Sequence, residues 1–239
     1  MKKIIYHSIK PFAFIVGLVI KKLNLSIEFD DLRIKFPKFM NSFELGYSIF
    51  GTYEKSERLL VKKYIKPEYA VLELGACLGV VSCTINRILN DKSKQVSVEP
   101  NLEVLDILLL NKQINNASFH IETCIVSNDT IVTFFGGGKA FLSSNVLHQN
   151  ENNIKVDGLT LQGLTSKYFD FDAIVMDIEG GELKFFQDFD LKISKVKTII
   201  FETHLGVLTH EEYNECFSIL KSYGFERIER INAVEVWKK

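Results

Sequence analysis

The feature that most restricts the fold of this chain is a regular alternation of short apolar segments with helical patterns, which begins at residue 70. Buried strands that alternate with helices form a largely parallel sheet with helices on both faces. The chain is therefore predicted to be an α/β protein. The expected strands are short, mostly apolar and rich in β-branched residues, and they lie at residues 70–74, 95–99, 119–123, 172–177 and 196–202.

The end of the chain departs from this alternation. Thr209 and Glu212 form a capping box, which predicts a helix that Gly224 ends. Residues 225–231 and 233–239 then read as two strands separated by a single residue, so they are expected to pair as an antiparallel hairpin. A parallel sheet finished by such a hairpin is typical of class I methyltransferases.

The 239 residues fit one α/β domain at residues 51–239, with an N-terminal extension at residues 1–50. Residues 11–20 of the extension are strongly apolar, but they are too few to span a bilayer as a helix. Two interpretations stay open. The helix packs on its own domain or on a second copy in a homo-oligomer, or residues 4–22 lie in a membrane interface with their lysines on lipid phosphates.

Composition excludes some functions. The formal net charge of −1 gives no basis for binding nucleic acid, because there is no excess of basic charge to neutralise phosphates. The four cysteines show no zinc-binding spacing, so a reducing cytoplasm is the expected compartment, with membrane association as the variant. Residues 127–161 interrupt the alternation and are expected to form a hairpin-like insertion, in which the glycines at 136–138 make a flexible turn or a loop over a ligand.

The first expected strand runs into a glycine-bearing turn, Gly75-Ala76-Cys77-Leu78-Gly79. A dinucleotide-binding turn needs glycine at the third position, because only glycine lets the backbone approach a pyrophosphate. Cys77 stands there, and its Cβ obstructs that approach. S-adenosylmethionine has no phosphates and needs room beside the turn for its methionine part. The turn therefore favours S-adenosylmethionine over NAD, and a βαβ fold without an adenosyl ligand is the alternative.

Two glutamates flank this turn. Glu99 ends the second expected strand, where its carboxylate can accept both ribose hydroxyls of the cofactor. Glu73 precedes the turn, where it could accept the ammonium of the methionine part or orient the loop.

A second polar group follows the strand at residues 172–177. Asp177, Glu179 and Glu182 are carboxylates that are costly at a buried strand end unless they are solvated, hydrogen-bonded or bound to a cation. Glu179 and Glu182 share a face if the helix has already begun. The alternative for Glu182 is stabilisation by the helix dipole alone.

A third group closes the next strand. Glu202 and His204 alternate with Phe201 and Thr203, so we expect them to point to the same side. Asp177 and His204 follow strands that we expect to be adjacent, about 4.8 Å apart, so both could reach one acceptor hydroxyl.

With these groups in place, the sequence resembles the FkbM family of S-adenosylmethionine-dependent methyltransferases. The family pattern Asp-x-Glu-Gly-x-Glu falls on Asp177, Glu179, Gly180 and Glu182. The chain departs from the family at three positions, with Glu73 for a common Asp, Cys77 for a common Asn and Met176 for a frequent Lys. The matching segments are residues 51–60, 71–79, 96–111, 176–183 and 201–204.

The resemblance implies a Rossmann-like class I methyltransferase fold with a mostly parallel seven-stranded sheet. It also implies O-methylation, often of a sugar hydroxyl in a polysaccharide, glycolipid or secondary metabolite. Catalytic roles are expected for His204, Asp177 and Glu179, and substrate contacts for Glu54, Glu182 and Glu202. Cofactor contacts are expected at Glu73, Gly75, Ala76, Cys77, Gly79, Glu99, Pro100, Asn101, Cys124 and Asp177.

Methyl transfer to a sugar hydroxyl needs a base, or a cation that acidifies the hydroxyl. His204 is the favoured base, because its intrinsic pKa lies nearest neutrality. A Mg²⁺ ion bound by Asp177 with Glu179 or Glu202 is the other scheme. Two different functions also stay open: a non-catalytic scaffold in a polysaccharide assembly complex, and an NAD-linked sugar oxidoreductase.

Overall fold

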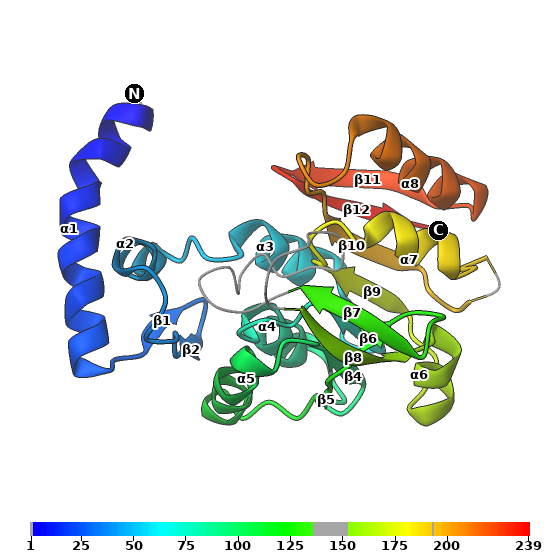
Figure 1. The fold of residues 1–239 in the computed structure, drawn as a ribbon, viewed down its shortest axis with the longest axis horizontal. Coiled ribbons are helices and arrows are strands. Elements are labelled where there is room, and N and C mark those ends of the chain that lie inside the picture. Colours follow the sequence, from blue (N-terminus) through cyan, green and yellow to red (C-terminus); the bar gives the residue numbers. More distant parts are fainter. Residues whose placement is uncertain (1, 136–152, 193) are drawn as a thin grey trace.

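The structure is a computed structural model that describes residues 2–135, 153–192 and 194–239. Its centre is a seven-stranded sheet in the order β11-β12-β10-β9-β3-β4-β5 (Figure 1). Pairing is parallel from β10 to β5, and β12 is antiparallel to both β10 and β11. The strands are β3 Val71–Leu74, β4 Gln95–Val98, β5 His120–Glu122, β9 Ala173–Met176, β10 Thr198–Glu202, β11 Glu226–Ile231 and β12 Val234–Lys238.

This sheet confirms the predicted α/β class, the parallel core and the antiparallel C-terminal hairpin, which together make the class I methyltransferase fold. The five predicted parallel strands all form, each within two residues of its expected bounds. α8 (His210–Ser222) begins with the predicted capping box, and Gly224 follows its end in the left-handed conformation, with φ of 83°.

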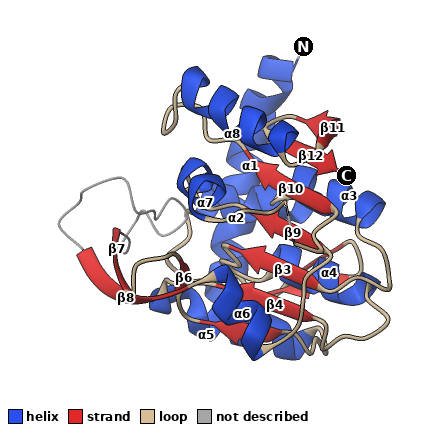
Figure 2. Ribbon diagram, turned by 90° about the vertical axis from the view of Figure 1, so that its right-hand side faces the viewer, coloured by secondary structure: helices blue, strands red, loops and turns tan. Residues whose placement is uncertain are grey.

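Helices cover both faces of the sheet (Figure 2). Alternate side chains of each strand point to opposite faces, so Leu72 and Leu74 join a core with α6 (Leu161–Lys167), α7 (Glu182–Asp188) and α8. Val71 and Val175 face the other way and pack with α3 (Lys55–Tyr64) and α4 (Val80–Ile88). α5 (Leu102–Ile114) packs beside α4 through Leu108.

The first 50 residues form α1 (Lys2–Leu23), β1 (Ile27–Phe29), β2 (Leu32–Ile34), α2 (Ser42–Tyr47) and the short 3₁₀ helix η1 (Ser48–Phe50). β1 and β2 make a hairpin whose apolar side chains share a core with α4 and α5. Asn111 of α5 fastens this hairpin, because its side chain accepts from the Lys35 amide at 2.7 Å and donates to the Lys35 carbonyl at 2.9 Å. Within the described residues, no helix combines the length and apolar character needed to cross a bilayer.

The predicted insertion is a small separate sheet beyond the carboxyl ends of the central strands (Figure 2). β7 (Ile131–Phe135) and β8 (Asn153–Leu159) pair antiparallel, as predicted, and β8 also pairs with β6 (Ile125–Val126). The glycines at 136–138, for which two roles were open, lie outside the described residues.

One close backbone contact joins the exits of β3 and β9. A Cβ added at Gly75 would lie 1.9 Å from the carbonyl oxygen of Asp177, and the residue has φ of +85°. Only glycine satisfies both conditions, because any other residue would carry left-handed strain and collide with fixed backbone.

We expect Gly75→Ala to lower the free energy of unfolding by about 2–5 kcal/mol, as left-handed strain and overpacking combine. Gly224→Ala is the matched control, because Gly224 has φ of +83° but nothing within 4 Å of the added Cβ. Its free energy of unfolding should fall only by the cost of the left-handed conformation, about 1–2 kcal/mol. Urea denaturation of both variants measures the difference, and equal losses would show that the contact with Asp177 is not tight.

Candidate functional site

A cavity of about 280 Å³ opens at the carboxyl ends of β3, β4 and β9. This is near the lower end of the volumes usual for small-molecule sites. In open parallel sheets such a position is where ligands bind. Its walls come from the turn after β3, the segment after β4, the turn after β9, the segment before α3, and the insertion around β6.

Glu99 is fixed in the wall of this cavity by two backbone amides. Its Oε2 accepts from the Cys77 amide at 2.7 Å and its Oε1 accepts from the Asn101 amide at 2.8 Å. Burial raises the pKa of Glu99 to about 7, although these two hydrogen bonds lower it. The carboxyl group is thus held in one orientation, with the remaining lone pairs of its oxygens available to a donor in the cavity.

Backbone strain gathers at the same place. Among the described residues, eight other than glycine have positive φ, and five of these are Asn or Asp, which tolerate that conformation. The remaining three are Glu54, Cys77 and Glu179, with φ of 47°, 45° and 52°. All three line the cavity. Strained residues that cluster at one cavity indicate a functional site, because the surrounding fold must hold them there.

The other residues expected to contact a cofactor divide into two groups. Gly75, Pro100 and Cys124 line the cavity with Cys77 and Glu99. Ala76, Gly79 and Asn101 support the walls from behind: Ala76 is buried, Gly79 begins α4, and the Asn101 side chain caps α5 by accepting from the Glu103 amide at 3.0 Å.

Glu73 is not placed to reach the cavity. It points to the opposite face of the sheet from its neighbour Leu74, and its Oε2 accepts from the Ser97 hydroxyl at 2.5 Å. Burial raises its pKa to about 7. The geometry is against a contact with the cofactor's ammonium, and it leaves the other expectation, in which Glu73 ties β3 to β4 below the turn.

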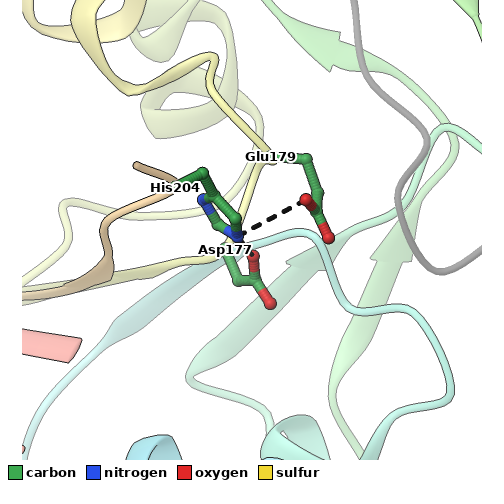
Figure 3. A group of neighbouring side chains, drawn as sticks. All are labelled: Asp177, Glu179 and His204. Carbon is green, nitrogen blue, oxygen red and sulfur yellow. Dashed lines mark ion pairs between the residues drawn. The ribbon is translucent and has the colours of Figure 1, made fainter. Parts of the chain in front are cut away.

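Beside the cavity, His204 lies against Asp177 and Glu179, two of the carboxylates predicted after β9 (Figure 3). Its Nε2 lies 3.2 Å from Asp177 Oδ1 and 3.5 Å from Glu179 Oε2, and its Nδ1 lies 3.2 Å from Glu182 Oε1. The amide of His204 also donates to the Tyr213 hydroxyl. β9 and β10 are adjacent and parallel, which confirms the expectation that Asp177 and His204 meet at neighbouring strand ends.

This environment is against the expectation that His204 titrates near neutrality. Burial alone would lower its pKa, but the hydrogen bonds and negative charges of Asp177 and Glu182 outweigh burial and raise the pKa to about 11. The ring is therefore an imidazolium at neutral pH. Both of its nitrogens carry protons, so it cannot accept one from a substrate while the cluster stands as it does.

Stabilisation by the helix dipole does not fully account for Glu182. It begins α7, is fully buried, and also accepts weakly from the Gly180 amide at 3.3 Å. The helix has not begun at Glu179, so the two glutamates do not share a helical face; they approach His204 at different ring nitrogens. The helix dipole alone does not explain a fully buried carboxylate, whereas an imidazolium partner does.

The expectation that Glu202 and His204 point to the same side is wrong. β10 ends at Glu202, and beyond it the alternation of side chains is lost. Glu202 shares a hydrogen bond with Glu57 of α3, on the opposite face of the sheet from α7. Burial and the hydrogen bond with Glu57 raise the pKa of Glu202 to about 9.

Within the part of the chain that the structure describes, two sets of side chains are close enough together to hold a cation. Asp177, Glu179 and His204 form one, and Glu57, Asp177 and Glu202 form the other, with ligand atoms within 4.8 Å of one another. Mg²⁺ prefers oxygen ligands, so the second set fits it better. The imidazolium already supplies positive charge to the first set.

The sequence argument did not single out some residues of the site. Tyr53 lines the cavity, with its hydroxyl 3.8 Å from Cys77 Sγ, and Lys184 of α7 lines it from the other side. Both Tyr53 and Glu57 lie in the segment 51–60 that carried the family resemblance, next to Glu54, and this was the available signal. Tyr213 comes from α8, and nothing in the sequence connects it to His204.

A family model described as the methyltransferase FkbM domain matches residues 73–227. No curated protein sequence matches the chain.

Among solved structures, the ribosomal protein L11 methylase from Lactobacillus delbrueckii subsp. bulgaricus aligns at 13% identity and a TM-score of 0.47, covering 77% of this chain and 75% of that one. An O-methyltransferase from Bacillus cereus aligns at 17% identity and a TM-score of 0.45, covering 79% of this chain and 81% of that one. Fibrillarin from Aeropyrum pernix aligns at 12% identity and a TM-score of 0.45, covering 77% of this chain and 73% of that one.

The pKa of His204 is directly testable. We expect nitrogen-15 NMR to find both ring nitrogens protonated at pH 8, with titration near 11 and not near 6.5. The stability that the raised pKa contributes should be fully present below pH 6.5 and lost as the pH rises through about 11. His204→Gln identifies the signal by its disappearance. A His204 signal that titrates between pH 6 and 7 would contradict the cluster as described.

Proposed function

The chain belongs to the FkbM methyltransferase family, and from this premise we propose that it methylates a sugar hydroxyl of a polysaccharide, glycolipid or related glycoside. The family makes it an S-adenosylmethionine-dependent methyltransferase. The choice of oxygen as the methylated atom, and of a sugar as the acceptor, is the proposal. The observation that carries it is one cavity with a fixed carboxylate for the cofactor at one wall and a carboxylate–imidazolium cluster at the other.

The charge of the cavity fits this cofactor. Glu54, Glu99 and Glu179 all line it, and burial is the largest cause of the raised pKa of each. Glu54 Oε2 is buried without a hydrogen-bond partner. Carboxylates in this condition favour a cationic ligand, and S-adenosylmethionine carries a sulfonium and an ammonium group. NAD would instead bring the negative charges of a pyrophosphate against the same carboxylates, which disfavours the oxidoreductase alternative.

The residues present suggest how the cofactor would be held. Glu99 would accept from the ribose hydroxyls, since its two amide donors leave lone pairs free in a fixed orientation. The left-handed Cys77 and the bare backbone of Gly75 leave room beside the turn for the methionine part. Glu54 lines the cavity on the side of α3, and from there it would face the positive charge of the cofactor.

The bound cofactor supplies a methyl group on a positively charged sulfur, which is open to in-line attack by an oxygen lone pair. Such an attack would form a carbon–oxygen bond and break the carbon–sulfur bond, whose electron pair would stay on sulfur. The acceptor hydroxyl must lose its proton, and the chain must hold the oxygen in line.

We assign the removal of the acceptor hydroxyl's proton to Glu179 rather than to His204. Burial and the neighbouring charge of Asp177 raise the pKa of Glu179 to about 7, and its side chain lines the cavity with 22% of its surface exposed. A base whose pKa lies near the working pH is the most effective kind. His204, already protonated, would position Asp177 and Glu179 and stabilise their charges. Asp177 also lines the cavity and can accept from the acceptor hydroxyl.

The first test concerns Glu99. Glu99→Gln keeps the shape of the side chain but removes the charge-assisted hydrogen bonds to the ribose, so affinity for S-adenosylmethionine should fall at least about tenfold. Isothermal titration calorimetry measures this loss. Glu226→Gln, at an exposed position on β11, is the matched control and should bind as wild type does. Unchanged affinity in Glu99→Gln would remove Glu99 from the cofactor site.

The second test concerns the base. Glu179→Gln should lower kcat by about 10²–10⁴-fold while cofactor affinity stays near wild type. Turnover is followed by transfer of tritiated methyl from S-adenosylmethionine to a panel of methyl glycosides and glycolipids. With Glu179 as base, wild-type kcat should level off by about pH 8, whereas an activity that keeps rising towards pH 11 would assign the base to His204.

The same assay separates the remaining alternatives. Loss of turnover in EDTA that Mg²⁺ restores would favour a cation held by Glu57, Asp177 and Glu202 over a base acting alone. Tight binding of S-adenosylmethionine with no transfer to any acceptor would favour the scaffold. Transfer to amines and not to hydroxyls would overturn the proposed O-methylation.

A further inference from the structure

The N-terminal helix α1 is fixed to the protein along one side only. It crosses α2 at two glycines: a Cβ at Gly17 would lie 1.7 Å from the Ser42 carbonyl oxygen, and a Cβ at Gly46 would lie 1.7 Å from the Ala13 carbonyl oxygen. Ala13 and Ile20 are buried on this side. Because the two backbones touch, the orientation of α1 on α2 is set by packing and not by a loose tether.

The opposite side of α1 is apolar and exposed. Figure 1 places α2 and the β1–β2 hairpin along one flank of the helix and shows the other flank open. Six residues of α1 leave between 45% and 61% of their surface in solvent: Phe12, Phe14, Ile15, Leu18, Val19 and Leu23. Two of them, Ile15 and Val19, also line an open hollow with β1 and η1. A helix that is apolar on all sides is normally covered on all sides, by protein or by lipid.

The charges of α1 are all of one sign. Its sequence holds five lysines and no acidic residue, whereas the whole chain has a formal net charge of −1. Positive charge is thus segregated onto the same helix as the exposed apolar surface. Lys21 and Lys22 stand in its last turn, beside Leu23.

We propose that the free side of α1 lies on the surface of an anionic membrane, with the apolar side chains among the acyl chains and the lysines on lipid phosphates. This is how in-plane helices bind, by apolar area together with attraction to anionic lipids. A second copy of the chain fits the same surface less well, because pairing two α1 helices would bring two all-cationic segments together. The membrane instead offers a surface of opposite charge.

The segment that holds α1 is continuous with the wall of the cavity. α2, which holds α1, leads through η1 directly to Tyr53 and Glu54 in the cavity wall. The inference does not depend on the proposed acceptor, because it rests on the surface of α1 alone.

Vesicle flotation of the full-length protein tests the proposal. The wild type should bind vesicles of phosphatidylcholine with about 30% phosphatidylglycerol. The double variant Ile15→Glu/Leu18→Glu should bind at least about tenfold more weakly, because two apolar anchors become anions. Lys21→Gln/Lys22→Gln should lose about fivefold per lysine on these vesicles and nothing on pure phosphatidylcholine.

The matched control is Leu109→Glu/Ile228→Glu, which adds two charges at exposed apolar positions outside α1 and should bind as the wild type does. Circular dichroism and calorimetry with S-adenosylmethionine check that each variant is folded. Equal vesicle binding by the α1 variant and the control would overturn the proposal, as would no binding by the wild type. A wild-type dimer in sedimentation that the α1 variant dissociates, without vesicle binding, would assign the surface to a second copy.

Discussion

The contact of Gly75 with the carbonyl of Asp177 is the constraint on which the rest of the site depends. It brings the exits of β3 and β9 together at a distance that no side chain allows. After β3, the turn brings the amide of Cys77 into a hydrogen bond with Glu99. After β9, the chain continues to Glu179 and α7. Both walls of the cavity are therefore set by one backbone approach, and a change there would alter both at once.

Charge balance is the second organising element. The carboxylates around His204 would repel one another if nothing stood between them, and the imidazolium supplies the positive charge that keeps them together. Its cationic state follows from these neighbours, not from the residue type. Glu54 also faces the cavity, and its Oε2 is buried without a hydrogen-bond partner, which is consistent with a cationic cofactor completing the balance.

Much of the fold could be predicted because its signals are local. The capping box at Thr209, the β-branched segments and the hairpin at the end of the chain each depend on residues close in sequence, and all formed as expected. One error concerned a side chain at a strand end. Glu202 contacts Glu57 of α3, on the face of the sheet opposite α7, and alternation could not decide this, because the face depends on where the strand ends and on which helix lies above it.

The sequence by itself determined the order of the strands along the chain, the glycine turn and the carboxylates that follow each strand, since hydrophobic period and residue type are written locally. Only the tertiary structure decided which of these groups meet. Glu182 and His204 are 22 residues apart, yet they share a hydrogen bond that helps to raise the pKa of the ring. Such a pairing changes a pKa through distance and burial, and these two quantities exist only when the chain is packed.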